Sequence, residues 1–164
     1  MNKELEHKFV TLLEENQNIV HKVCRIYANN QESHNDLFQE ITIQLWKAFS
    51  KFRGESKFTT WMYRVSLNTA ITLYRKSKRD IKTSDIETIN FRITAEEYDT
   101  EVEERLKLMY AAIKRLNDIE KALVLLYLEN KSYKEIADTM GISEVNARVK
   151  MNRVKTKLKK ILNP

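Results

Sequence analysis

The C-terminal end of the chain carries a run of bases that contains no acid. Seven Lys/Arg lie between Arg148 and Lys160, and no Asp/Glu follows Glu144. An ordinary solvated helix face is the weaker alternative, because such faces usually mix both signs. Basic side chains along a helix neutralise phosphates and release counterions, so their binding to nucleic acid depends on salt. The run therefore indicates a surface that binds double-stranded DNA.

A short helix and a tight turn are predicted immediately before this run. Ser132 and Glu135 have the spacing of a capping box, in which each side chain bonds the backbone amide of the other residue. Gly141 suits the turn that follows, because glycine enters the left-handed region of backbone space without steric cost. Ala137 and Ala147 are small enough to let the helices on either side approach closely. The pattern predicts a helix-turn-helix.

The final helix, capped by Ser143, has separate sides for packing and for DNA. An apolar and a basic stripe share one helical period: Ala147, Met151, Val154, Leu158 and Ile161 for the first, and Lys150, Arg153, Lys157 and Lys160 for the second. Side chains in the first turns can reach base edges, and later bases can lie along phosphates. Asn146, Arg148 and Lys150 are therefore predicted to reach base edges, and the later lysines to lie along phosphates.

The elements that must position these residues are helices. Two glycines and one proline supply too few turn residues for hairpins, while 42% hydrophobic residues suffice for packed cores. Helical spacing of apolar residues predicts helices over about 3–29, 36–49, 57–76 and 120–128, and another from residue 101. The first has a possible break at Asn16-Gln17-Asn18, and Ser33 or Asn35 is expected to cap the second. The predicted fold class is all-α.

Charge divides the chain into three parts. Residues 1–76 hold 11 Lys/Arg and 8 Asp/Glu, residues 77–104 hold 4 and 9, and residues 105–164 hold 14 and 6. The acidic part also loses the apolar period, except for an expected helical turn near Ala95. We therefore predict two small helical domains, 1–76 and 102–164, that face polyanions and are joined by an acidic flexible linker, 77–101.

Other reactive residue types form no catalytic or metal-binding pattern. Cys24 is the single cysteine, which excludes an internal disulfide and a cysteine-based metal cluster, and a buried core thiol is expected. His7, His21 and His34 lack metal-ligand spacing. We expect no catalytic residue, no metal and no cofactor. Because the sequence shows neither a long apolar run nor a signal peptide pattern, a cytoplasmic protein without membrane insertion is expected.

The first module and the helix-turn-helix together resemble one protein family. The first module contains Asp36-Leu37-Phe38-Gln39-Glu40, Leu45-Trp46-Lys47-Ala48-Phe49 and Lys51-Phe52-Arg53-Gly54-Glu55-Ser56-Lys57-Phe58-Thr59-Thr60-Trp61-Met62-Tyr63-Arg64-Val65. These residues resemble the second region of bacterial sigma factors of the extracytoplasmic function class. The segment from Leu128 to Leu158 resembles their fourth region. The likeness covers roughly residues 5–76 and 102–162 and preserves the order and spacing of both regions.

The resemblance implies an alternative sigma factor that binds core RNA polymerase and directs promoter-specific transcription initiation. Asp36, Gln39 and Glu40 fall where the family binds polymerase, although Asp36 and Glu40 alone would indicate a solvated carboxylate pair. Residues 1–76 would bind the minus-ten element and capture one flipped base, which needs an apolar wall and an amide. The residues implied in minus-ten binding are Phe52, Arg53, Lys57, Val65, Asn68, Arg75 and Lys76. Trp61 is expected to belong to the core instead.

In the C-terminal module the resemblance implies binding to the minus-thirty-five element. The residues implied in this binding are Asn146, Arg148, Val149, Lys150, Asn152, Arg153 and Lys157. Many relatives carry Thr-Val-Arg-Ser-Arg where this chain has Asn146-Ala147-Arg148-Val149-Lys150, so the preferred DNA sequence cannot be copied from a relative. Promoter DNA and core RNA polymerase are the expected partners. The family also implies an anti-sigma protein that holds the factor inactive.

Two other functions compete with this interpretation. A helix-turn-helix regulator that never binds polymerase would need only the C-terminal module, and the Asp36–Glu40 block argues against it. An enzyme acting on nucleic acid would need metal ligands, for which Asp36, Glu40 and Glu55 are the available carboxylates. The sequence offers neither a His/Asp/Glu cluster nor a glycine-rich phosphate loop for such an enzyme.

Overall fold

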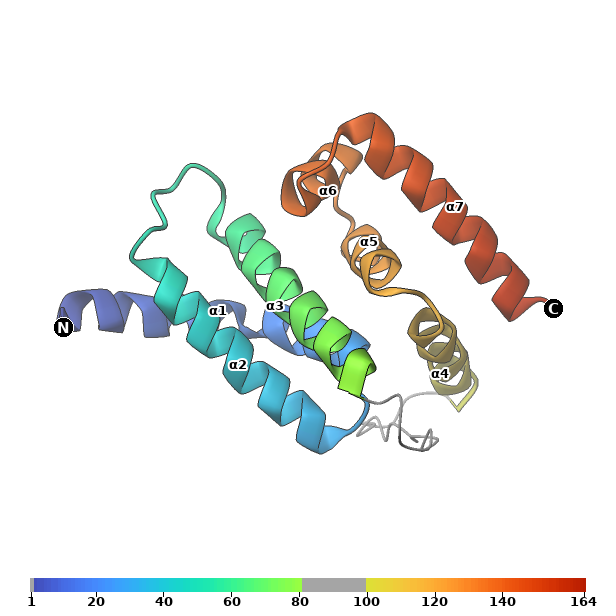
Figure 1. Cartoon of the computed structure of the whole chain (residues 1–164), viewed down its shortest axis with the longest axis horizontal. Helices are drawn as coiled ribbons and strands as arrows, with labels where there is room; N and C mark the ends of the chain where they lie inside the picture. The colour runs from blue at the N-terminus through green and yellow to red at the C-terminus, as the bar shows by residue number, and fades with distance from the viewer. Residues whose placement is uncertain (1, 81–99) are drawn as a thin grey trace. The chain divides into compact units, whose positions relative to one another are not determined.

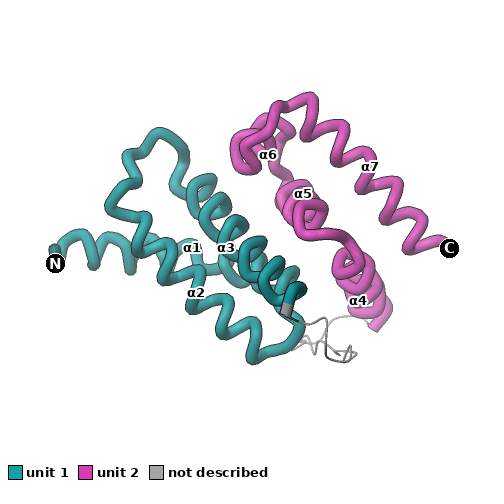
Figure 2. The backbone as a smooth tube through the Cα atoms, viewed as in Figure 1, with its two compact units in different colours: residues 1–82 teal, residues 83–164 magenta. Residues whose placement is uncertain are grey.

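The computed structural model describes residues 2–80 and 100–164, and the regular secondary structure within these ranges is entirely α-helical. The helices of Figure 1 are α1 (Lys3–Tyr27), α2 (Gln31–Phe49), α3 (Phe58–Asp80), α4 (Thr100–Lys114), α5 (Asp118–Leu128), α6 (Tyr133–Met140) and α7 (Glu144–Leu162). The chain divides into two compact units, Met1–Lys82 and Thr83–Pro164, here called unit 1 and unit 2 (Figure 2). The predicted fold class, two helical domains of which the second is a helix-turn-helix, is confirmed.

The predicted linker lies mostly outside the described residues. Helix α3 continues to Asp80, beyond the predicted helix end at Lys76, and α4 begins at Thr100. The helical turn expected near Ala95 also lies outside the described residues.

Unit 1 is a bundle in which each of α1, α2 and α3 packs against the other two. Its most deeply buried side chains come from all three helices: Val20, Val23, Cys24, Ile41, Leu45, Met62 and Leu67. Burial raises the pKa of the Cys24 thiol to about 12, so this cysteine stays protonated. The prediction that Cys24 is a core thiol is confirmed.

Two local predictions for unit 1 are wrong. Helix α1 is continuous through residues 16–18, where Asn16 Nδ2 donates to the Leu12 carbonyl at 2.9 Å. Because apolar residues on both sides of this polar stretch pack on the same bundle, the helix does not break. Helix α2 begins earlier than predicted, with Asn30 as its N-cap and Ser33 as the reciprocal partner of that cap. Two Asn30–Ser33 hydrogen bonds, at 2.8 and 3.0 Å, close this capping box.

Unit 2 is organised around α7, which contacts α4, α5 and α6 (Figure 1). The predicted turn chemistry between α6 and α7 is confirmed. Ser132 and Glu135 form the capping box of α6, and Ser143 accepts a hydrogen bond from the Asn146 amide at the start of α7. Between the helices, Gly141 has φ 70° and ψ 35°, which lies in the left-handed region.

A close approach of α6 and α7 completes the helix-turn-helix. Ala137 on α6 is 5% exposed and Ala147 on α7 is fully buried. Their methyl groups are small enough for the two backbones to pack closely. Met151 and Val154 continue the buried side of α7, as the sequence predicted.

Replacement of Gly141 tests the backbone conformation that joins α6 to α7. A Cβ at this position meets no atom within 4 Å, so Gly141→Ala acts only through its positive φ. We expect a loss of about 1 kcal/mol in the unfolding free energy of unit 2. Gly141→Asn should cost less, since Asn tolerates the left-handed region. Far-UV circular dichroism follows both units, whereas Trp46 and Trp61 report unit 1 alone, so their fluorescence midpoint should not move.

A histidine pair joins α1 to α2 in unit 1. His21 Nδ1 and His34 Nε2 are 3.2 Å apart, and Phe38 stacks on the His21 ring at 4.6 Å. Burial, and then the charge of Arg25, lowers the pKa of His21. Burial, and then the charges of His21 and Arg25, lowers the pKa of His34. The two facing nitrogens can share only one proton, so the pair disfavours a state in which both rings are protonated.

This pair should make unit 1 sensitive to mild acid. Because both pKa values are lower in the folded state, the stabilisation is present above about pH 6.5 and is lost as the pH falls below it. We expect the urea midpoint of tryptophan fluorescence to fall between about pH 7.5 and 5.5. His34→Gln should reduce this dependence, whereas His7→Gln, at an exposed position on α1, should not. An equal effect of both substitutions would mean that the pair is not responsible.

Candidate nucleic-acid interface

The solvent side of α7 carries a central line of uncharged residues. Val145, Val149, Asn152 and Thr156 follow one another at steps of four, three and four, opposite the buried stripe. Val145 is 72% exposed and Val149 is 43% exposed, so two apolar side chains on this line face solvent. Apolar side chains on such a line can contact thymine methyl groups, and an amide can pair with adenine.

Lysine and arginine side chains lie on both flanks of this line. The first flank contains Asn146, Lys150, Arg153 and Lys157, at steps of four, three and four, and the second contains Arg148, Lys155 and Lys159. All seven residues predicted to contact DNA on α7 therefore lie on the central line or its flanks. The arrangement suits a helix in a groove, with phosphates on either side and base edges ahead.

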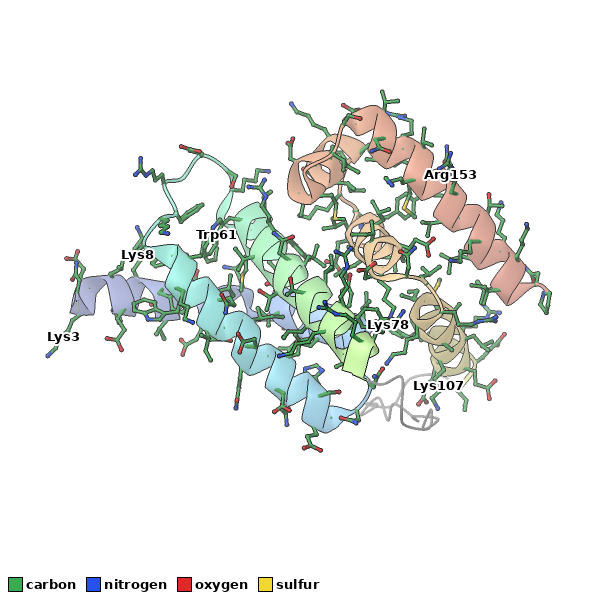
Figure 3. All side chains as sticks on the ribbon, in the orientation of Figure 1. Lys3, Lys8, Trp61, Lys78, Lys107 and Arg153 are labelled. Carbon is green, nitrogen blue, oxygen red and sulfur yellow. The ribbon has the colours of Figure 1, made fainter. Side chains whose placement is uncertain are left out.

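The basic side chains of α7 differ in their intramolecular contacts. Lys157 Nζ lies 2.9 Å from a carboxylate oxygen of Glu120, which also accepts a hydrogen bond from the backbone amide of Asn117 at the start of α5. Arg148 forms an ion pair with Glu144 at 3.3 Å. Arg153 is exposed on α7 (Figure 3) and makes no ion pair within the described part of the chain.

Helix α3 provides a second candidate surface, in unit 1. Trp61, Val65, Asn68, Thr72, Arg75 and Arg79 recur at alternating steps of four and three and form one row, called the α3 row. Lys57 extends this row, because its carbonyl accepts the Trp61 amide at 3.1 Å. The predicted Val65, Asn68 and Arg75 lie in the row, while Lys76 lies beside it. Arg79 belongs to the row and was missed by sequence reasoning, because α3 was expected to end at Lys76.

An aromatic cluster stands at the start of the α3 row. The centroid of the Phe52 ring lies 5.8 Å from that of Phe58 and 5.0 Å from that of Trp61. The Phe49 ring, on α2, lies 6.2 Å from the Trp61 ring, also between centroids. Trp61, labelled in Figure 3, is half-buried, so the prediction that it belongs to the core is only partly correct. Arg53 is exposed in the loop before α3. The cluster, the loop and the row together offer stacking, hydrogen bonding and positive charge.

Helix α2 presents a third surface, with mixed chemistry. Asp36, Gln39, Glu40 and Lys47 share one side of the helix, where Gln44 Nε2 also donates to Glu40 Oε1 at 2.9 Å. Ile43 stands among them and is 45% exposed. Sequence reasoning missed Ile43, although its steps of three and four from Glu40 and Gln39 place it on this side. An exposed apolar residue ringed by charges is typical of a protein-binding surface.

The described residues meet neither the requirements of a metal site nor those of a membrane-spanning helix. Within residues 2–80 and 100–164, no three or more His, Cys, Asp or Glu side chains gather in a group suited to a metal ion. Asp36 and Glu40 lie on α2, whereas Glu55 lies in the loop before α3. No helix in the described ranges is both long and apolar enough to span a bilayer.

Two protein families match the chain, one in each unit. Residues 12–80 match Sigma-70 region 2, and residues 106–158 match Sigma-70 region 4. These ranges contain the α2 surface and the α3 row in the first case and the helix-turn-helix in the second.

Individual relatives agree with these matches. The RNA polymerase sigma factor SigZ of Bacillus subtilis is 31% identical over 137 residues, which cover 82% of this chain and 75% of the relative. The ECF RNA polymerase sigma-E factor of Escherichia coli is 31% identical over 144 residues, covering 79% and 75%. The corresponding factor of Haemophilus influenzae is 29% identical over 140 residues, covering 79% and 74%.

Solved structures share the fold at lower sequence identity. The sigma factor RpoE in complex with the anti-sigma factor NepR from Bartonella quintana gives a TM-score of 0.73 at 17% identity, covering 98% of each chain. CnrH in complex with the cytosolic domain of CnrY gives a TM-score of 0.68 at 18% identity, covering 96% of this chain and 89% of that one.

Proposed function

Because the chain belongs to the extracytoplasmic function (ECF) class of bacterial RNA polymerase sigma factors, we propose that its two units divide the recognition of a promoter between them. It is an alternative sigma factor that directs promoter-specific transcription initiation by core RNA polymerase. The observation that carries the proposed division is the presence of two separate basic helix surfaces, one on α7 and one on α3.

Unit 2 binds the minus-thirty-five element through α7. Asn146, Arg148 and Lys150 lie in its first turns, where side chains reach base edges in the major groove. Val149 contributes an apolar contact on the central line, where many relatives have a serine hydroxyl. Farther along, Asn152 also faces the groove, while Arg153 and Lys157 contact phosphates, which contribute affinity without reading sequence.

Unit 1 binds the minus-ten element through the aromatic cluster and the α3 row. A base that has left the duplex stack needs an aromatic or apolar wall, which Phe52 and Val65 supply, and a polar group such as the Asn68 amide to read its edge. Arg53, Lys57, Arg75 and Lys76 then bind the backbone of the opened strand. Arg79 extends this basic end of α3.

The α2 surface binds core RNA polymerase. Asp36 and Glu40 pair with a basic partner surface, and Gln39 adds hydrogen bonds. Ile43 gives the contact an apolar centre, from which binding excludes water. This surface distinguishes a sigma factor from a helix-turn-helix regulator, because such a regulator has no use for it.

The remaining parts of the proposal follow from the family. The chain acts in the cytoplasm by binding rather than by catalysis and needs no cofactor. An anti-sigma protein holds it inactive, and one of the similar solved structures is a sigma factor in complex with an anti-sigma factor. Such a partner would cover the DNA-binding side of one unit and the α2 surface of the other.

Run-off transcription tests the proposed function directly. The full chain, mixed with purified core polymerase, should produce transcripts from a subset of a randomised promoter library. The preferred templates should share two sequence elements, one for each unit. A DNA-binding regulator would select a single element and give no transcript, even though it bound the same DNA.

Reversal of charge at Glu40 tests the α2 surface. Glu40→Lys places a like charge against a basic partner, which costs several kcal/mol and should weaken binding to core polymerase by roughly 100-fold or more. Competition with a second sigma factor for core polymerase measures this loss. Glu14→Lys, at an exposed position of α1, is the matched reversal and should compete normally. Normal competition by Glu40→Lys would remove α2 from the interface.

The intramolecular contacts of α7 predict that Arg153 and Lys157 contribute differently to the salt dependence of DNA binding. Arg153→Ala should lower the slope of log affinity against log salt by about one, because one phosphate contact is lost. Lys157→Ala should lower it by less, since Glu120 already offsets part of the Lys157 charge. Holoenzyme binding to one promoter at several salt concentrations gives both slopes. Equal slopes for the two variants would show that the Lys157–Glu120 pair opens at no cost when DNA binds.

A further inference from the structure

Two tyrosines contact two of the three basic side chains on the second flank of α7, Arg148 and Lys155. The guanidinium carbon of Arg148 lies 4.7 Å from the ring centroid of Tyr133, and Lys155 Nζ lies 4.3 Å from the ring centroid of Tyr127. Both distances fall within the range of about 6 Å over which a ring face attracts a cation. On the first flank, neither Lys150 nor Arg153 has such a ring contact within the described residues. The two flanks are therefore held differently.

The turn between α5 and α6 holds both rings on an ordered backbone. Asn130 occupies the left-handed region at φ 59°, and its amide donates to the Tyr127 carbonyl at 3.1 Å. The Lys131 amide donates to the Leu126 carbonyl, also at 3.1 Å. Tyr127 is the penultimate residue of α5, just before this turn, and Tyr133 is the first residue of α6, directly after the N-cap. Backbone hydrogen bonds thus fix the origin of each ring.

We propose that Tyr133 is a positioning residue that orders Arg148 for reading one base pair, while Tyr127 orders Lys155 for a phosphate. This inference rests on the proposed function of α7. A free arginine side chain samples many rotamers, and contact with a ring reduces the entropy that binding must remove. The contact with the ring uses none of the guanidinium N–H groups, so they can pair with the acceptors of a guanine once the contact with Glu144 opens.

The other contacts of these two bases are compatible with this role. Glu144 accepts a hydrogen bond from Arg148 Nη2 at 3.3 Å and holds the guanidinium from a second side. Both partners of that ion pair are more than half exposed, at 57% and 52% of the side chain, so it can open when DNA arrives. Hydrogen bonding to Tyr127, with a further contribution from Tyr133, raises the pKa of Lys155, a side chain that is charged at neutral pH in any case.

Selection of DNA from a library separates positioning from general stability. Holoenzyme assembled from core polymerase and each full-length variant binds promoters in which the upstream element is randomised. Sequencing of the bound DNA gives a discrimination ratio at each base pair. Arg148→Ala should lower the discrimination ratio at one base pair by roughly 5-fold or more. Tyr133→Leu should lower the ratio at that same base pair by roughly 2- to 5-fold and leave the others unchanged.

Three further variants sharpen the test. Tyr133→Phe keeps the ring and should keep the discrimination ratio. Tyr133→Leu combined with Arg148→Ala should add nothing beyond Arg148→Ala alone. Tyr127→Leu, the matched loss of a ring on the same flank, should weaken all DNA sequences similarly and leave every ratio unchanged. Thermal unfolding of each variant checks that unit 2 remains folded.

Each contrary result has a distinct meaning. Uniform loss of discrimination in Tyr133→Leu, or an unchanged ratio at the Arg148 base pair, overturns the positioning role and leaves base reading by Arg148 intact. A Tyr133→Phe variant as poor as Tyr133→Leu overturns the role of the ring. If Arg148→Ala lowers the discrimination ratio at no base pair, the proposal that Arg148 reads a base pair is itself wrong.

Discussion

The burial of one side of α7 is the constraint on which the C-terminal unit depends. Ala147, Met151 and Val154 are almost fully buried against the other helices of that unit. Because the helix has a fixed period, burying this side leaves the opposite side and both flanks in solvent. The lysine and arginine side chains of α7 then lie on these flanks or on the solvent side, where DNA can reach them. The same packing that stabilises the unit therefore orients its binding surface.

Unit 1 combines packing and binding in a different way. Its aromatic cluster is shared between the core and the surface, since Phe49 is buried while Phe52 and Trp61 are half-buried. Aromatic rings can contribute to both, because one face packs on the bundle while an edge or face remains available to a base. The basic end of α3 follows on the same row. A strand of DNA can thus pass from stacking contacts to charge contacts along one helix.

Intramolecular contacts distinguish bases that look equivalent in the sequence. Lys157 is held by Glu120, Arg148 by Tyr133 and Glu144, and Arg153 by no ion pair in the described part of the chain. A contact within the protein lowers the net attraction to phosphate when it neutralises charge. It favours specific reading when it orders the side chain without neutralising it. The basic run therefore contains residues whose intramolecular contacts differ.

The sequence by itself determined the helical class, the helix-turn-helix and the family. The first two rest on local chemistry: the Ser132 capping box, the left-handed turn at Gly141 and the helical period of the final stripe. The family rests on the resemblance of the motifs in residues 36–65 and 128–158 to those of sigma factors. The tertiary structure alone decided which residues come together across helices. The pairing of Glu120 with Lys157 and the tyrosine contacts of Arg148 and Lys155 join residues far apart in the chain, which no helical period predicts. Continuity of α1 through its polar stretch was decided in the same way, because burial of the flanking residues outweighs a weak local preference.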